Sequence, residues 1–219
     1  EGYFSTAGGT GLRRELVDDA EWLAGLLVGL LPDEPEPLGL LALVRLHLAR
    51  WDSRLDAGGR LVLLADQDRG RWDRARVDGA RALIERAAAQ GRLGPYQLEA
   101  AIAAVHCEAP SWEETDFEEL LGLYSLLGAI DPSPVVRLNR AVVLAQVRGP
   151  AAALAEVDAL AAELDRYHLF HATRASFLRA LGRADEARQA DERALERTEN
   201  PAERALLAGR LGSGGPPGA

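Results

Sequence analysis

Residues 65–75, with the sequence ADQDRGRWDRA, hold the densest group of side chains that could do chemistry. Three aspartates, three arginines and a tryptophan stand within these eleven residues. Such a set could form a calcium loop, a nucleotide-binding site or an acid/base pair, or it could be the polar start of a helix. The spacing of the residues decides among these alternatives.

The calcium alternative fails on spacing. Asp66 and Asp68 match the first and third positions of an EF-hand loop. However, Arg71 stands where that loop needs its turn glycine, and Val77 stands where it needs a bidentate acid.

The segment fits the start of a helix better. Gly70 is acceptable as an N-cap, Asp73 can reach back to free backbone N–H groups, and Trp72 is expected to face inward. The three arginines are then left either for ion pairs with neighbouring acids or for contact with another protein.

Other catalytic and ligand-binding patterns are incomplete. The chain has no lysine, which a P-loop requires, and GGTGLRR at 8–14 follows no predicted strand. A G-x-S-x-G nucleophile motif is missing. His168 and His171 could bind zinc from one helix face, but no further ligand has a suitable spacing, so we expect packing or capping there. We therefore predict no catalytic residue, no metal site, no cofactor and no enzyme activity.

Composition limits the partners. The net charge is −9, from 25 basic residues, all arginine, and 34 acidic ones. Because nucleic-acid binding usually needs a basic stripe, we expect no direct nucleic-acid contact. The single cysteine, Cys107, lies in an apolar helical stretch and is predicted to be buried and inert. No 18-residue apolar run or signal peptide is present, which predicts a soluble, cytoplasmic protein.

Apolar residues recur with helical spacing along almost the whole chain, and strand alternation is nearly absent. The predicted fold class is all-α, with about ten helices in antiparallel pairs that stack as a TPR-like right-handed superhelix. The first helix is expected at about 12–31 and stopped by Pro32. One of its faces carries Leu16, Ala20, Leu23, Leu27 and Leu30.

The remaining helix boundaries follow from capping signals. The second and third helices are predicted at about 36–55 and 71–91, and Pro95 suits the first turn of the fourth. Further starts are predicted, in chain order, at Thr115, at Ser133 before Pro134, and at Asn200 before Pro201.

An internal repeat is the clearest organisational signal. NRAVVL at 139–144 aligns with TRASFL at 173–178, an offset of 34 residues. Each copy continues through a glycine into a second, alanine-rich helix. A helical hairpin with this period is typical of tetratricopeptide (TPR) repeats. Since two copies cannot bury their faces alone, the earlier helices are expected to stack on them.

We therefore divide the chain into three parts: an N-terminal helical part at 1–130, two TPR-like repeats with a capping helix at 131–212, and a disordered tail at 213–219.

Six motifs, taken in order, resemble the C-terminal extension of bacterial extracytoplasmic-function sigma factors that carry a TPR-like domain. The motifs are EGY, LLPDEPEPLGLLAL, LVLLADQDRGRWDRA, GPYQLEAAIAAVHCEAP, TDFEELLGLYSLL and PSPVVRLNRAVVLAQVRGP. In that family the extension follows a helix ending in Asn-Glu-Gly-Tyr, of which Glu1, Gly2 and Tyr3 match. Gly70 and Phe117 stand where members often have Ser and Trp.

The resemblance implies a non-catalytic regulatory domain that modulates transcription initiation by the intact protein. It implies the sigma regions of the same protein, core RNA polymerase or a small co-encoded regulatory protein as partners. The two sigma regions are absent from this sequence, and its start at Glu1 predicts a fragment, a processed product or a recombinant piece. There are two alternatives. The chain could be a stand-alone TPR-like scaffold that binds a peptide or protein, or it could be a helical domain that senses a small molecule.

The polar residues at motif positions are the candidates for a partner surface or a ligand pocket, or they form a structural network. They are Tyr3, Arg71, Trp72, Asp73, Gln97, His106, Asn139 and Arg140.

Overall fold

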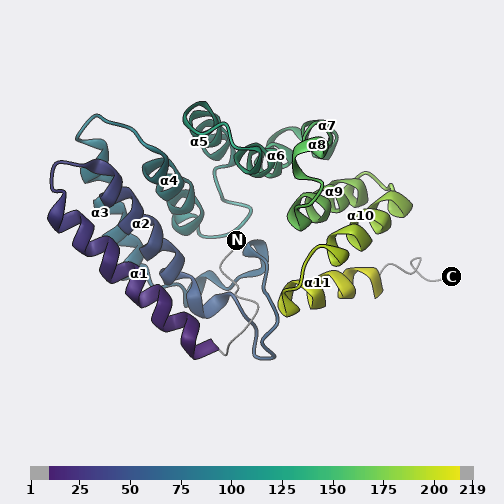
Figure 1. Ribbon diagram of the computed structural model, residues 1–219, viewed down its shortest axis with the longest axis horizontal. Helices are drawn as coiled ribbons and strands as arrows, with labels where there is room; N and C mark the ends of the chain where they lie inside the picture. The colour runs from purple at the N-terminus through teal and green to yellow at the C-terminus, as the bar shows by residue number, and fades with distance from the viewer. Residues whose placement is uncertain (1–9, 213–219) are drawn as a thin grey trace. The chain divides into compact units, whose positions relative to one another are not determined.

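The computed structural model describes residues 10–212, and side chains from residue 15 onward. Within that range the chain forms eleven α-helices and three 3₁₀ helices (Figure 1), so the predicted all-α class is confirmed. Tyr3 and the predicted disordered tail at 213–219 lie outside the described residues.

The chain divides into two compact units. Of the described residues, 10–56 and 62–131 form the N-terminal unit, and 57–61 and 132–212 form the C-terminal unit. Each unit contains its own apolar core.

The N-terminal unit is built around one central helix. Its α-helices are α1 (Thr10–Leu30), α2 (Pro35–Ala49), α3 (Arg74–Ala88), α4 (Pro95–Glu108) and α5 (Phe117–Ile130). Between α2 and α3 lie η1 (Trp51–Ser53), η2 (Leu64–Asp66) and η3 (Arg69–Arg71). Helix α2 packs against α1, α3 and α4 (Figure 1), which explains why leucines occur on several of its sides.

The apolar face predicted for the first helix is not the one that enters the core. Ala24 is buried and Val28 packs beside it, because small or branched side chains let α1 lie close to the rest of the core. Leu16, Leu23 and Leu30 instead stay exposed. Helix α1 is apolar on two sides, and spacing alone does not say which one packs.

The second and third helices have different ends from those predicted. Helix α2 stops at Ala49 rather than near residue 55, and the Ala49 carbonyl accepts a hydrogen bond from Asp73 N at 2.9 Å. Helix α3 starts at Arg74, because the carboxylate of Asp73 accepts from Arg76 N at 3.1 Å and makes Asp73, not Gly70, the N-cap.

Thr115 is not the N-cap of α5. That role belongs to Asp116, whose carboxylate accepts from Glu119 N at 2.8 Å. Thr115 is buried and donates its hydroxyl to the carbonyl of Ser111. A buried threonine with an acceptor nearby is unavailable to the helix start, so the exposed aspartate next to it takes the position.

Gly39 sets the distance between α2 and the start of α4. A Cβ atom at this position would lie 2.7 Å from Gln97 N and 2.9 Å from Gln97 Cα. Both are backbone atoms, which cannot rotate away. The two helices can therefore approach this closely only with glycine there.

Gly39→Ala is expected to lower the free energy of unfolding by roughly 1–3 kcal/mol, because the helices must separate. Gly25→Ala on α1 is the matched control, since nothing lies within 4 Å of its Cβ position and alanine favours the helix. Urea denaturation followed by circular dichroism at 222 nm measures both. Equal effects of the two substitutions would contradict the close approach.

The C-terminal unit contains the 34-residue repeat. Its helices are α6 (Pro134–Arg148), α7 (Pro150–Asp158), α8 (Ala161–Leu164), α9 (His168–Ala180), α10 (Ala184–Glu196) and α11 (Pro201–Gly212). Helix α6 pairs with α7 and α9 pairs with α10, as the repeat predicts. Gly149 and Gly182, with φ of 83° and 74°, provide the left-handed turns between the paired helices.

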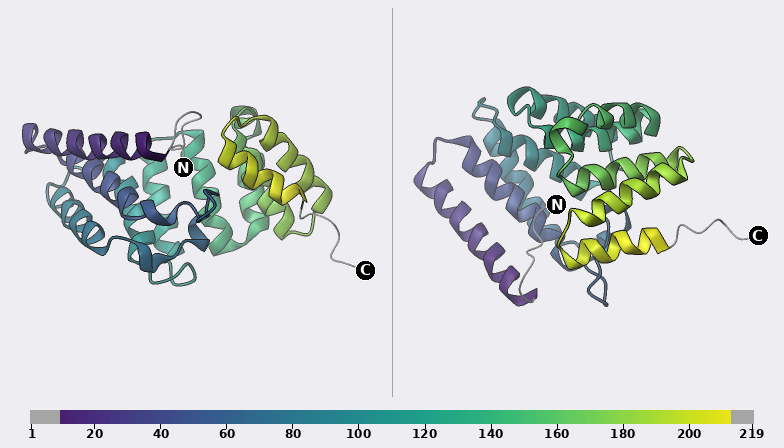
Figure 2. Two further views of the ribbon diagram at one scale, coloured as in Figure 1. Left: turned by 90° about the horizontal axis from the view of Figure 1, so that it is seen from below. Right: turned by 45° about the vertical axis from the view of Figure 1, so that its right-hand side comes forward.

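Small residues bring the helices of this unit together. Ala141, Ala153, Ala175 and Ala187 belong to one buried core, and Ala175 is the repeat equivalent of Ala141. Helix α7 packs on both α6 and α9, while α10 packs on α9 and α11 (Figure 2). The second helix of the first copy is interrupted after Asp158 and resumes as α8.

Two predicted helix starts in this unit are confirmed. Ser133 accepts from Val135 N at 3.3 Å and caps α6. Asn200 accepts from Ala202 N at 2.9 Å at the start of α11. Both signals are local, so they do not depend on the packing of distant elements.

Candidate functional site

Two of the aspartates in residues 65–75 cap helices. The carboxylate of Asp68 accepts from Gly70 N at 2.9 Å at the start of η3. Asp73 caps α3 in the same way. These carboxylates satisfy backbone N–H groups that would otherwise lack partners. They are structural groups rather than an acid/base pair.

Trp72 is the centre of the motif. Its side chain is 3% exposed, and its indole N–H donates to Ser53 Oγ at 2.8 Å. The guanidinium groups of Arg69 and Arg50 lie 4.8 Å and 5.5 Å from the centre of its ring. Ser53 in turn donates to the carbonyl of Arg50 at 2.8 Å. The predicted inward orientation of Trp72 is correct, and two cations stabilise the ring.

Two arginines of the motif bind the end of α4. Arg69 Nη1 donates to the carbonyls of His106 and Ala109 at 2.6 and 2.8 Å, and Arg74 Nη1 donates to that of Cys107 at 2.8 Å. The last carbonyls of a helix have no partner within it and carry partial negative charge. Arg69 and Arg74 therefore hold the segment before α3 against α4. Arg71, between them, is exposed.

Gln67 also belongs to the hydrogen-bond network around Trp72. Its side-chain amide donates to the carbonyl of Val62 at 3.2 Å, and its carbonyl oxygen accepts from Arg50 Nε at 3.3 Å. Gln67, Arg50 and Arg69 are all buried. Since buried polar groups are costly without partners, this network fixes the path of residues 50–73.

The other N-terminal candidates lie at opposite ends of α4. Gln97 is buried near its start, where its amide donates to Glu36 Oε1 and to the carbonyl of Arg92. His106 lies near its end, with its ring parallel to that of Trp112 at a centroid distance of 6.0 Å. Nine residues of helix separate them by roughly 13 Å, so they do not line one small pocket.

The last two candidates belong to the C-terminal unit. Asn139 is exposed on α6. Arg140 donates from Nη1 to both carboxylate oxygens of Glu156 on α7, at 2.9 and 2.7 Å. The structure therefore divides the candidate residues between two units and uses most of their side chains internally.

The thiol of Cys107 is fully buried, and burial raises its pKa to about 11. A thiolate is the reactive form, so at neutral pH this cysteine is unreactive.

Burial has the opposite effect on two histidines. Together with the positive charge of Arg50, it lowers the pKa of His106 to about 4 and that of His47 to about 3. A buried imidazole is disfavoured in its charged form, and a neighbouring arginine adds repulsion. Both rings are neutral in the folded chain at neutral pH.

The free energy of unfolding is expected to fall as the pH drops below about 6.5, the unfolded value for histidine. The unfolded chain then binds protons that the folded chain excludes, so stability is complete above this pH and is lost toward the folded pKa. His106 alone should cost roughly 2–3 kcal/mol between pH 6.5 and 4.5. Urea denaturation at four pH values measures this, and His106→Phe should reduce the dependence while leaving the contribution of His47. A profile that is flat in the unsubstituted chain would contradict it.

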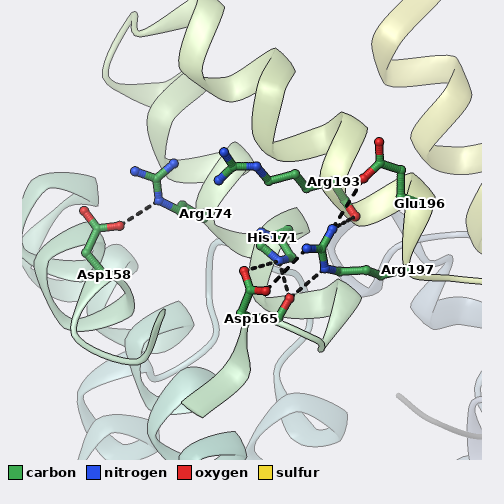
Figure 3. A network of polar contacts seen from close by, with 7 residues as sticks. All are labelled: Asp158, Asp165, His171, Arg174, Arg193, Glu196 and Arg197. Atoms are coloured by element: carbon green, nitrogen blue, oxygen red, sulfur yellow. Dashed lines mark hydrogen bonds and ion pairs between the residues drawn. The ribbon is translucent and has the colours of Figure 1, made fainter. Parts of the chain in front are cut away.

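A polar network in the C-terminal unit was missed by sequence reasoning (Figure 3). The carbonyl of Asp165 accepts hydrogen bonds from His171 Nε2 and Arg197 Nε, both at 2.7 Å. Arg197 also donates to the carbonyl of Arg193. The network joins the segment before α9 to the end of α10, which explains the burial of His171. The bond between Asp165 and Arg197 spans 32 residues, so no short motif predicts it.

Figure 3 also shows Arg174, which points to Asp158 on α7. Its Nε donates to Asp158 Oδ1 at 2.7 Å. Arg140 and Arg174, one repeat apart, therefore both bind acids of α7. The 34-residue offset in the sequence is the signal that could have revealed the pair.

The zinc alternative does not match the positions of the two histidines. His171 Nε2 is bound to the carbonyl of Asp165, and His168 Nε2 lies 2.9 Å from Glu203 Oε2. In the described part of the chain, no group of three or more His, Cys, Asp or Glu side chains could hold a metal ion.

Across the same residues, no helix is both long and apolar enough to span a membrane.

Asp191, on α10, carries a fully buried carboxylate. Oδ2 forms an ion pair with Arg179, while no hydrogen-bond donor in the described residues reaches the buried Oδ1. Burial lowers the pKa of Arg210 on α11, and the negative charge of Asp191 opposes that lowering. The acid therefore interacts with arginines from two neighbouring helices.

Comparison with known structures defines the class of protein. The crystal structure of TTC0263, a thermophilic TPR protein from Thermus thermophilus, matches with a TM-score of 0.60, over 90% of each chain and at 20% identity. This chain is therefore an all-α protein with a TPR-like fold. At that identity the likeness concerns the fold alone.

Two sequence comparisons give its relatives. Residues 1–88 match the model of DUF6596, a family of unknown function. The uncharacterized protein R00370 of Rhizobium meliloti (strain 1021) is 46% identical over 207 residues, which are 94% of this chain and 49% of the relative. The chain thus spans about half the length of the curated relative that it matches.

Proposed function

We propose that this chain is a non-catalytic, TPR-like domain that binds a segment of another protein. The repeated helix pair carries the proposal, since α6 with α7 and α9 with α10 repeat at 34 residues and pack through small side chains. Stacked helical pairs of this kind present extended surfaces to their ligands. The internal contacts of Arg69 and Trp72 support a structural role for the motif that most resembles an active site.

The first helices of the two pairs offer the candidate binding surface. Asn139 and Val142 on α6 are exposed, and their equivalents 34 residues later on α9 are Thr173 and Ser176, the second also exposed. The neighbouring Arg140 is held by an acid of α7. A partner on these helices would therefore meet neutral side chains at repeating positions.

We further propose that the intact protein is an extracytoplasmic-function sigma factor and that this chain is its regulatory extension. The six ordered motifs support this, and the relative has a further half that this chain does not match. The partners are then the sigma regions of the same protein, core RNA polymerase or a small co-encoded protein, and the domain acts in the cytoplasm. The net charge of −9 suits a part that does not contact promoter DNA.

The test measures binding of this chain to two purified probes: the half of the Rhizobium meliloti relative outside the match, and core RNA polymerase. Asn139→Glu with Ser176→Glu adds two charges to the proposed surface. Ala155→Glu with Gln189→Glu adds two to exposed positions on α7 and α10. We expect at least tenfold weaker binding for the first pair and little change for the second.

Two outcomes would overturn parts of the proposal. Equal loss in both pairs would exclude the first helices as the binding surface. Binding to neither probe would exclude the proposal that the chain is a sigma-factor extension. The proposal of a TPR-like domain that binds another protein would then stand alone.

A further inference from the structure

Helix α1 has a second apolar side that nothing in the described structure covers. Ala24 and Val28 pack into the core of the N-terminal unit. The large side chains on the adjoining sides are between 39% and 74% exposed. They form the α1 face, which consists of Leu16, Trp22, Leu23, Leu26, Leu27 and Leu30. Contiguous exposed apolar side chains of this number mark an interaction surface.

The spacing on this face fits another helix. Four residues of the α1 face and the half-buried Ala20 beside them follow alternating steps of four and three residues, namely Leu16, Ala20, Leu23, Leu27 and Leu30. This is the heptad spacing with which one helix packs along another. The steps of three and four residues alternate whichever way the helix is read. A second α1 can therefore pack along the first in the antiparallel direction.

The charges on α1 favour that reversed orientation. The first half of α1 carries four acids, Glu15, Asp18, Asp19 and Glu21, against Arg13 and Arg14, which is a net charge of −2, whereas residues 22–31 carry no charge. Glu21 forms ion pairs with Arg45 and Arg76 inside the unit. In a parallel pair the acidic halves of two copies would lie side by side and repel each other. In an antiparallel pair each acidic half lies along an uncharged half.

We propose that the α1 face is a dimer interface, on which a second copy of this chain packs antiparallel with Leu16 near Leu30 of the partner subunit. Six large side chains at this exposure amount to on the order of 700 Å² per copy, close to the roughly 800 Å² that each partner contributes to a stable interface. This inference is independent of the function proposed above.

The oligomeric state of the chain tests the proposal. Light scattering after size exclusion and sedimentation velocity, from 1 to 100 µM, should give the mass of two chains. Leu23→Glu should raise the dimer Kd at least tenfold without changing the circular dichroism spectrum. Leu126→Glu on α5 is the matched control, since Leu126 is 52% exposed and Leu23 is 53% exposed. This control should remain a dimer.

Disulfide trapping tests the orientation. A mixture of Leu16→Cys and Leu30→Cys chains should form a mixed disulfide, while Leu30→Cys alone should not, and the buried Cys107 does not interfere. If Leu23→Glu fails to fold, Leu30→Glu at the end of α1 replaces it. The proposal would be overturned if the unsubstituted chain is a monomer at 100 µM. It would also be overturned if a folded variant of the α1 face still forms the dimer. Rapid trapping of Leu30→Cys alone would overturn the antiparallel arrangement.

Discussion

Trp72→Ala is expected to lower the free energy of unfolding of the N-terminal unit by roughly 3–5 kcal/mol. The substitution removes a buried ring from the core cluster formed with α2, α3 and α4. It also leaves the hydroxyl of Ser53 without its indole donor and removes the aromatic ring that the guanidinium groups of Arg50 and Arg69 contact. Urea denaturation followed by circular dichroism gives the change directly.

Trp72→Phe separates the two causes. Phenylalanine keeps most of the buried ring but loses the hydrogen bond to Ser53, so the expected loss is roughly 1–2 kcal/mol. Leu93→Ala, at an exposed position between α3 and α4, should leave the unfolding midpoint within error. An unchanged midpoint for Trp72→Ala would mean that Trp72 is not a core residue.

Arg179→Met is expected to destabilise the C-terminal unit by roughly 3 kcal/mol, because it leaves the fully buried carboxylate of Asp191 without its ion-pair partner. The positive charge of Arg210 compensates only in part. The same denaturation experiment measures the loss.

A double substitution controls for this effect. Arg179→Met combined with Asp191→Leu removes both charges, and an apolar pair of similar volume should recover much of the lost stability. Losses that simply add in the double variant would show that the two side chains do not interact.

Local signals predicted much of the fold. The 34-residue offset between Ala141 and Ala175 located the two helix pairs, since each pair is a contiguous stretch of sequence. Ser133 and Asn200 gave helix starts in the same way, because an N-cap bonds to backbone only two or three residues away. Trp72 was predicted to face inward at the start of the third helix.

The features that escaped prediction depend on distant parts of the chain. Which side of α1 packs is decided by Ala24 against the core, not by spacing within α1. The bonds of Asp165 to His171 and Arg197 join residues that no motif connects.

Two of the candidate polar residues show how a helix separates side chains that share a motif. Gln97 and His106 are close in sequence, yet a helix places them at opposite ends of α4. The amide of Gln97 donates to Glu36 and to the carbonyl of Arg92, and the ring of His106 stacks on that of Trp112. A motif indicates that a polar side chain has a role, but it does not show whether that role is structural or ligand binding.

Arg69 and Arg71, two residues apart, distinguish a structural motif from a ligand site. Arg69 is buried and binds the end of α4, whereas Arg71 is exposed. We expect Arg69→Gln to lower the free energy of unfolding by roughly 2–4 kcal/mol, since it leaves buried carbonyls without their charged donor. We expect Arg71→Gln to change it by less than about 0.5 kcal/mol. A stable Arg69→Gln chain beside an unstable Arg71→Gln chain would contradict the structural role of residues 65–75.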